Sequence, residues 1–260
     1  MSSESVGSAG SSSGSIRYDD IGRTYAITRK QDPRIAAQIR AALGSGGPVV
    51  NVGAGTGNYE PVDLTVVAVD PSVRMLVQRE QRSRLVVRGV AERLPFPDRA
   101  FEVALATFTV QHWDDRKAGL RELGRVSHRQ VVVCHQPTEA NHLWMGDYFD
   151  EDVGHGTGLP ESDLDLVHAC LQVREVRPVL VPRDCIDGFG GAFWARPEAY
   201  LDPVVQAGIS ELANLSERAR ARWTARLAAD LESGEWDRRH GSLRTMTECD
   251  LGYRLVIAKR

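Results

Sequence analysis

The sequence predicts an α/β fold in which an open, doubly wound and mostly parallel sheet of seven strands carries helices on both faces. Short runs rich in β-branched residues alternate with segments of helical spacing, and this alternation is typical of such sheets. The first run, residues 49–52, passes directly into Gly53, Gly55 and Gly57. Glycine permits a sharp turn and a close approach of the backbone to a ligand. The sequence therefore predicts a ligand site at the end of the first strand.

The other elements follow from the same patterns. Strands are expected at residues 49–52, 66–70, 85–87, 101–106, 130–134, 173–181 and 252–258, and Pro178 is expected to break the sixth of them. Helices are expected at residues 33–43, 71–78, 164–170 and 210–232, with a further helix that Asp114 caps and a single helical turn at 58–63. Residues 183–241 predict a mostly helical cap inserted before the last strand. Residues 1–15, which are mostly Ser and Gly, predict a disordered tail, so that residues 16–260 form one domain.

Composition narrows the range of partners. With 260 residues and a formal net charge of −3, the chain has no excess of basic residues that would attract nucleic acid or an acidic membrane. No apolar run reaches the roughly 18 residues that span a bilayer. No His, Asp and Glu side chains have metal-ligand spacing, and the four cysteines are far enough apart to predict free thiols. We therefore expect a cytoplasmic monomer or homodimer without a metal, nucleic-acid or membrane partner.

Polar side chains follow three of the expected strands. Asp70 ends the second strand, where a carboxylate can accept from both hydroxyls of a ribose, so the ligand is expected to contain a nucleoside. His112 and His135 follow the fourth and fifth strands, whose carboxyl ends meet at the same edge of the sheet. Either histidine is a candidate base for a nucleophile that must lose a proton, and packing or helix capping is the alternative role.

Four sequence pieces resemble, in their order, the class I S-adenosylmethionine-dependent methyltransferases. They are VVNVGAGTG at the first strand, VAVDPS at the second, GVAERLPFPDRAFE after the third and ATFTVQHW after the fourth. Within that family the chain is similar to the small-molecule group of the ubiquinone/menaquinone methyltransferases. The resemblance implies a Rossmann-like methyltransferase fold and methyl transfer by in-line displacement to a small-molecule acceptor, in a setting of secondary metabolism. The implied cofactor is S-adenosyl-L-methionine and the product S-adenosyl-L-homocysteine.

The resemblance also assigns cofactor contacts residue by residue. They fall on Tyr18, Tyr25, Arg29, Gly53, Ala54, Gly55, Gly57, Asp70, Pro71, Ala91, Glu92, Thr107 and Phe108. The glycine turn would pass under the methionine part, and Asp70 would hold the ribose. Ala91 and Glu92 would contact the adenine. This chain has Val90 where the family often has an Asp that bonds the adenine amine, which leaves Arg93 or backbone groups to compensate.

The remaining assignments concern the reacting end of the cofactor. Thr107 and Phe108, at the end of the fourth strand, would lie below the sulfonium. Tyr18, Tyr25 and Arg29 resemble the residues of an N-terminal lid that reach the cofactor carboxylate.

Several alternatives remain open at this point. A nicotinamide-dependent oxidoreductase has the fingerprint GxGxxG with an acidic residue roughly twenty positions further on, whereas here the third glycine comes one residue early. A non-catalytic cofactor-binding protein would carry the same motifs. The acceptor is open as well, because the aromatic residues of the later part either wall a pocket for an aromatic or apolar acceptor or pack in the core. These residues are Trp144, Tyr148, Phe149, Phe189, Phe193 and Trp194.

Overall fold

The computed structural model describes residues 28–79, 85–136, 138, 142–150 and 162–259. The strands are β1 (Val49–Val52), β2 (Val66–Asp70), β3 (Leu85–Arg88), β4 (Phe101–Thr107), β5 (Ser127–His135), β6 (Gln172–Pro178), β7 (Val181–Pro182), β8 (Glu248–Cys249) and β9 (Tyr253–Lys259). The α-helices are α2 (Pro33–Leu43), α3 (Val73–Val77), α4 (Arg116–Val126), α5 (Asp163–Cys170), α6 (Pro203–Gly208), α7 (Ser210–Ala213), α8 (Glu217–Glu232) and α9 (Glu235–His240). Short 3-10 helices are η1 (Val110–His112), η3 (Trp144–Tyr148), η4 (Pro197–Leu201) and η5 (Gly241–Thr245).

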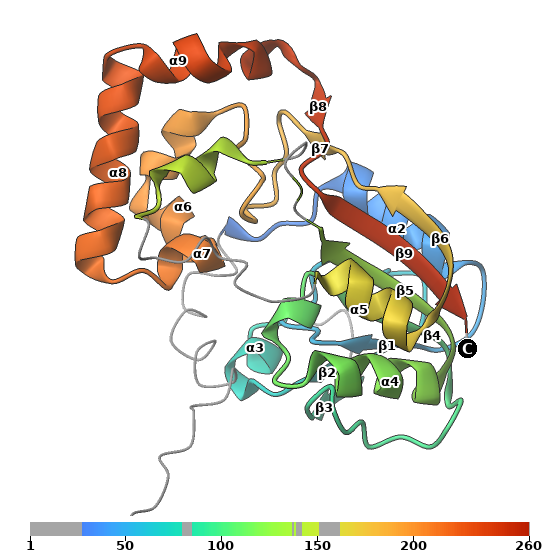
Figure 1. The fold of residues 1–260 in the computed structure, drawn as a ribbon. Helices are drawn as coiled ribbons and strands as arrows, with labels where there is room; N and C mark the ends of the chain where they lie inside the picture. The colour runs from blue at the N-terminus through green and yellow to red at the C-terminus, as the bar shows by residue number, and fades with distance from the viewer. Residues whose placement is uncertain (1–27, 80–84, 137, 139–141, 151–161, 260) are drawn as a thin grey trace, which may run out of the picture.

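Seven strands form one sheet in the order β3-β2-β1-β4-β5-β9-β6. Strands β1 to β5 run parallel, and β9 lies antiparallel between β5 and β6. The order reverses beside β1, which pairs with β2 on one side and with β4 on the other. Open α/β sheets bind ligands at such a switch point. The predicted open, doubly wound and mostly parallel sheet of seven strands is confirmed (Figure 1).

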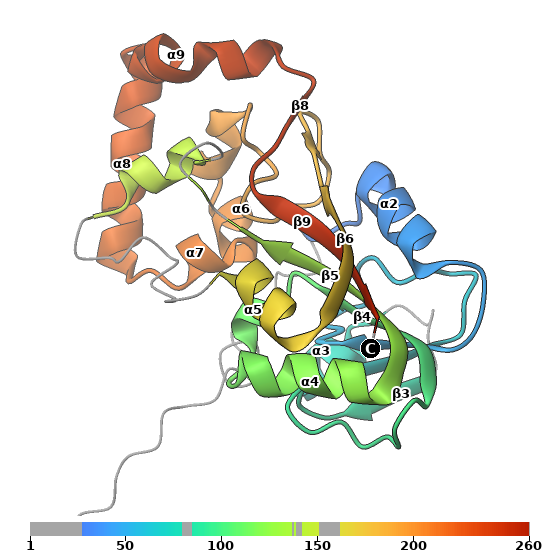
Figure 2. The ribbon, with the colours of Figure 1, turned by 45° about the vertical axis from the view of Figure 1, so that its right-hand side comes forward.

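Alternate residues of the central strands point to opposite faces of the sheet. Val49 of β1 shares a buried cluster with Ile35 and Ile39 of α2, whereas Val50 shares another with Leu120 of α4. Figures 1 and 2 show α2 on one side of the sheet and α4 with α5 on the other. Because both faces are covered, β1 is buried along its whole length. The turn that follows β1 therefore begins from a rigid point.

Helices α6 to α9 form a cap that the chain enters after β7 and leaves through β8 (Figure 1). Its buried cluster is rich in aromatic side chains, among them Trp144, Tyr148, Tyr200, Trp223 and Trp236. Trp144 and Tyr148 belong to η3, so a segment that precedes α5 supplies part of this core. The cap has a hydrophobic core of its own, and its boundary at residues 183–241 stays a prediction.

Two arginines of α8, the longest helix of the cap, bind residues at the end of η3 and just after it. Arg222 of α8 forms an ion pair with Asp150 at 2.6 Å, and Arg226 donates to the carbonyl of Tyr148 at 3.2 Å. Within the part of the chain that the structure describes, no helix is both long enough and apolar enough to cross a bilayer. The basic side chains of α8 thus join it to the segment around η3.

Two predicted helix boundaries were wrong. Residues 210–232 form two helices, α7 and α8, because the Ser216 side chain caps α8 by accepting from the backbone N–H of Ala219 at 3.2 Å. Asp115 rather than Asp114 caps α4. In both cases the N-cap is a polar residue that was not predicted to be one, and its side chain accepts from an unpaired N–H group in the first turn of the helix. Which polar residue caps the helix depends on its side-chain conformation, which the sequence does not show.

The strand before the cap breaks where the sequence predicted, whereas the turn after β1 differs from the prediction. Strand β6 ends at Pro178, the residue that was predicted to break it, since proline has no N–H to donate within a sheet. Residues 181–182 then form β7, which pairs with β8 in a separate ribbon. Residues 58–63 form turns and not the expected helical turn. The crossover from β1 to β2 is consequently an irregular loop.

Candidate functional site

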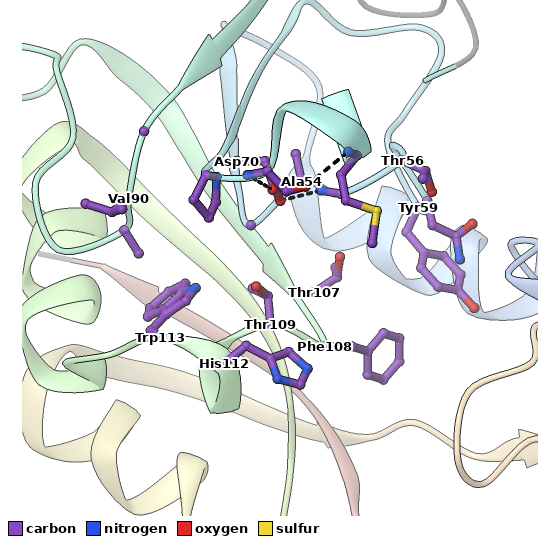
Figure 3. A pocket seen from close by; sticks show the side chains of 18 of the residues that line it. Ala54, Thr56, Tyr59, Asp70, Val90, Thr107, Phe108, Thr109, His112 and Trp113 are labelled. Carbon is purple, nitrogen blue, oxygen red and sulfur yellow. Dashed lines mark hydrogen bonds between the residues drawn. The ribbon is translucent and has the colours of Figure 1, made fainter. Parts of the chain in front are cut away.

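A pocket opens beside the carboxyl ends of β1, β2 and β4, where the sheet order reverses (Figure 3). It encloses about 1060 Å³ of empty space, a figure that includes open solvent at its mouth. The lining residues are Arg29, Gly53, Ala54, Gly55, Thr56, Asn58, Tyr59, Asp70, Pro71, Ser72, Met75, Gly89, Val90, Ala91, Glu92, Thr107, Phe108, Thr109, His112, Trp113 and Asp114.

Most of the residues to which the family resemblance assigned a cofactor contact lie together at this pocket. Arg29, Gly53, Ala54, Gly55, Asp70, Pro71, Ala91, Glu92, Thr107 and Phe108 all line it. Gly57 is not among the lining residues, and a Cβ on it would lie 3.2 Å from the guanidinium of Arg79. Tyr18 and Tyr25 lie outside the described residues.

The glycines of the turn are needed for different reasons. Gly53 has a φ of 69°, and a Cβ on it would lie 1.9 Å from Oγ1 of Thr109. The turn therefore lies directly against the segment after β4. Gly55 has a φ of 50°, and a Cβ there would meet nothing within 4 Å. Because Gly55 lines the pocket, its missing side chain lets a ligand approach the backbone.

A buried ion pair supports this turn. Arg79 donates to the carbonyl of Gly55 at 3.1 Å and to that of Ala54 at 3.4 Å, and it pairs with Glu60. Both charged side chains are only 4% exposed. Asn51 of β1 donates to Oε1 of Glu60 at 2.8 Å. This group was not predicted from the sequence, although an Asn in an otherwise apolar strand is a signal of a buried polar contact. Pairing together with hydrogen bonding stabilises the buried charges and holds the turn.

Asp70 ends β2 with its carboxylate at the pocket wall. Its Oδ2 accepts from the backbone N–H of Gly55 at 2.8 Å, and its Oδ1 from that of Ser72 at 2.9 Å (Figure 3). These bonds orient the carboxylate between the glycine turn and the start of α3. A carboxylate is an acceptor with about four lone-pair sites. The position therefore fits a group that accepts from sugar hydroxyls.

One end of the pocket presents two apolar side chains. Val90 and Trp113 lie at this end (Figure 3), and Trp113 packs on α4 where a Cβ on Gly119 would be 2.4 Å from its ring. Oε1 of Glu92 accepts from the backbone N–H of Asp115 at 3.1 Å, which ties the loop after β3 to the start of α4. This end suits a flat aromatic base.

Phe108 lines the pocket and packs on two aromatic side chains that do not line it. Its φ of 53° lies in the left-handed region, which a bulky residue rarely adopts, and its N–H donates to the carbonyl of Val133 at 2.9 Å. Its ring stacks on Phe189, in the segment between β7 and η4, at a centroid distance of 5.3 Å and meets Tyr253 edge-on at 5.5 Å. Phe189, one of the aromatic residues considered for an acceptor pocket, is therefore packed behind Phe108 and is 5% exposed.

The two candidate histidines have different surroundings. His112 lines the pocket, and its Nε2 lies 3.2 Å from Nε2 of Gln111, an amide nitrogen that can only donate. His135 is not among the lining residues: its Nε2 lies 3.0 Å from the carbonyl oxygen of Leu251, and its ring packs on Tyr253. Since a carbonyl only accepts, Nε2 of His135 carries the proton. Burial lowers the pKa of His135, so it is neutral near pH 7.

The predicted free thiols are confirmed. Cys134, Cys170, Cys185 and Cys249 form no disulfide, and burial raises the pKa of the Cys134 and Cys185 thiols to about 12. Among the described residues, no group of three His, Cys, Asp or Glu side chains could hold a metal ion. The groups that the pocket presents to an organic ligand are backbone groups, carboxylates, an arginine and aromatic rings.

Several known proteins are similar to this chain in sequence and in fold. Residues 50–134 match the family model described as "Methyltransferase domain". A demethylmenaquinone methyltransferase of Mycobacterium sp. (strain JLS) is 35% identical over 145 residues, which cover 50% of this chain and 63% of that relative. The relative of the same name from Mycobacterium tuberculosis (strain ATCC 25177 / H37Ra) is 33% identical over 145 residues and covered to 62%. The match thus spans less than two thirds of these relatives.

The likeness to solved structures extends over nearly the whole chain. A structure named as a methyltransferase from an antibiotic biosynthesis pathway of Anabaena variabilis ATCC 29413 has a TM-score of 0.80 and 30% identity, covering 90% of this chain and 99% of that one. The cyclase SpnF has a TM-score of 0.54 at 16% identity, covering 96% and 97%, and shares the fold alone. From the matched domain, the sheet order and the pocket that the motif residues line, the chain belongs to the class I S-adenosylmethionine-dependent methyltransferases.

Proposed function

We propose that the protein transfers a methyl group from S-adenosyl-L-methionine to a small-molecule acceptor. The supporting observation is the order of groups along the pocket: Asp70 lies between an end with Val90 and Trp113 and an end with Tyr59 (Figure 3), to which Arg29 also belongs. A nucleoside joined to an amino acid has the same order, with a flat base, ribose hydroxyls and a charged terminal group. The open space at Gly55 is consistent with this ligand.

In this proposal the chain binds, aligns and shields the reactants. When bound, the sulfonium supplies an electrophilic methyl group for an in-line displacement, which requires alignment and exclusion of water. Asp70 would hold the ribose hydroxyls, and Arg29 would attract the carboxylate. Phe108 would close the pocket toward the cap, because its ring is fixed by Phe189 and Tyr253.

A small aromatic or apolar acceptor fits this proposal best. The curated relatives are named for demethylmenaquinone, and the structure of 30% identity is named for antibiotic biosynthesis. Both names favour a small organic acceptor, and the ring of Phe108 at the pocket favours a flat one. A panel of quinol-like, phenolic and amine acceptors, incubated with methyl-labelled cofactor, would be read by product mass. Labelled products from amines alone would contradict this acceptor class.

Titration calorimetry tests the cofactor. We expect S-adenosyl-L-homocysteine and S-adenosyl-L-methionine to bind with a one-to-one stoichiometry, and NAD to give no binding heat. Binding of NAD alone would instead support an oxidoreductase. Cofactor binding without methylated product from any acceptor in the panel would support a non-catalytic protein.

The histidines give a prediction that separates a base from a packing residue. If His135 is the base, Nδ1 is the nitrogen that accepts the proton, because Nε2 already carries one, and His135→Ala lowers turnover about 100-fold, the size of a typical general-base contribution, while cofactor affinity is retained. Because burial lowers its pKa, the neutral form persists below the ordinary value of about 6.5. Wild-type turnover should therefore stay constant from neutral pH down to that value and fall only at lower pH.

Two further variants complete this test. His128 is exposed on the same strand, so His128→Ala serves as the matched control and should not change turnover. His112→Ala tests the histidine that lines the pocket. Full activity of His135→Ala across the pH range would remove it as the base, and a loss confined to His112→Ala would assign the role to His112.

A further inference from the structure

A fully buried carboxylate lies beside the pocket without lining it. Asp187 belongs to the segment between β7 and η4 and is 0% exposed. Removing a carboxylate from water is costly unless several donors satisfy it. Its donors are Arg29, Asn58 and Tyr59, which all line the pocket. Asp187 therefore contacts three residues of the pocket wall from outside the cavity.

The geometry of these bonds fixes the orientation of each donor. Arg29 donates from Nε to Oδ1 of Asp187 at 2.7 Å and from Nη2 to Oδ2 at 3.4 Å. Asn58 Nδ2 lies 3.2 Å and the Tyr59 hydroxyl 2.8 Å from Oδ2. Two contacts on one guanidinium define its plane as well as its place. A single carboxylate thus holds side chains from the segment before α2 and from the turn after β1.

Tyr59 meets Asp187 from a strained backbone conformation. Its φ of 64° lies in the left-handed region, and its side chain is turned inward so that the residue is 3% exposed. Burial and the charge of Asp187 raise the pKa of the Tyr59 hydroxyl, which therefore remains a donor. Strain of this kind persists where surrounding contacts over-determine it, and it gathers at functional sites.

The backbone on both sides of Asp187 is anchored to the segment that carries Arg29. The N–H of Ile186 donates to Oδ2 of Asp32 at 3.3 Å, and the N–H of Gly188 donates to the carbonyl of Thr28 at 2.9 Å. A Cβ on Gly188 would lie 2.8 Å from that carbonyl oxygen, so the approach requires glycine. The position of Asp187 relative to Arg29 is therefore set by backbone contacts.

We propose that Asp187 is a positioning residue that orients Arg29, Asn58 and Tyr59 toward the amino-acid end of the bound cofactor. Through it, the segment that leads into the cap sets the affinity for that end of the ligand. The inference rests on the proposed function, because it needs a nucleoside ligand with a charged amino-acid group.

Two ligands that differ only at this end test the inference. S-adenosyl-L-homocysteine has the amino-acid group, and 5′-methylthioadenosine lacks it but has the same adenosine. Asp187→Asn keeps the size of the side chain and removes its charge. We expect this variant to weaken S-adenosyl-L-homocysteine at least about tenfold and to leave 5′-methylthioadenosine within about twofold, as measured by calorimetry.

Matched variants make the outcome decisive. Asp184 lies three residues away and its side chain is 77% exposed, so Asp184→Asn should leave both affinities unchanged. If Asp187→Asn does not fold, Tyr59→Phe removes one donor and should show the same selective loss to a smaller degree. Unchanged affinity for S-adenosyl-L-homocysteine, or equal weakening of both ligands, would overturn the positioning role. Failure of the wild type to bind S-adenosyl-L-homocysteine would overturn the proposed function itself.

Discussion

Replacing Asp70 with alanine is expected to weaken cofactor binding about 100-fold. Two charge-assisted hydrogen bonds to ribose hydroxyls would be lost, each worth about 1.5–3 kcal/mol before water compensates. A net loss of about 3 kcal/mol corresponds to the expected change in Kd. Calorimetric titration with S-adenosyl-L-homocysteine measures it directly. Because Asp70 also accepts from the N–H groups of Gly55 and Ser72, the variant should in addition lose some order at the glycine turn.

Stability and a surface control separate these two effects. Asp63 pairs with Arg40 and its side chain is 55% exposed, so Asp63→Ala should leave the affinity unchanged. A urea titration of Asp70→Ala shows whether the fold is intact at the temperature of the binding experiment. Unchanged affinity of a folded Asp70→Ala variant would contradict the ribose assignment.

Replacing Gly53 with alanine is expected to destabilise the fold by about 2–5 kcal/mol and to abolish cofactor binding. The left-handed φ of 69° costs an L-residue about 1–2 kcal/mol. The new Cβ would also lie 1.9 Å from Oγ1 and 2.8 Å from Cβ of Thr109, a buried residue. The further cost of moving a packed side chain is about 1–3 kcal/mol. Denaturant unfolding of the purified variant measures the sum.

Two variants isolate the cause. Gly46 has nothing within 4 Å of a built Cβ, so Gly46→Ala should have little effect on stability. Truncating Thr109 to alanine removes Oγ1 but not the unfavourable φ. The double variant Gly53→Ala, Thr109→Ala should therefore recover part of the stability lost by Gly53→Ala, as a double-mutant cycle would show. Wild-type stability of Gly53→Ala would contradict the close approach of the turn to the segment after β4.

Much of the sheet was predictable because its signals are local. A run of β-branched residues such as 49–52 is buried on both faces of a parallel sheet and needs no partner to be recognised. The motif residues were likewise predictable as a group, since the carboxyl ends of parallel strands meet at one edge. Helix ends were harder to predict. Ser216 and Asp115 are the N-caps because of small differences in side-chain conformation, which helix propensity does not resolve.

The site likewise combines features that the sequence predicts with features that only the tertiary structure shows. By itself the sequence determined the strand and glycine-turn arrangement, the place of Asp70 and the family, because these depend on backbone conformation and on spacing within short segments. Only the tertiary structure decided that Asp187 meets Arg29 and Asn58, that Phe189 stacks on Phe108, and which histidine lines the pocket. Asn58 and Asp187 are separated by 129 positions. Contacts over such distances are formed by the packing of the cap segment on the sheet, and no local pattern of residues encodes which two side chains that packing brings within hydrogen-bonding distance.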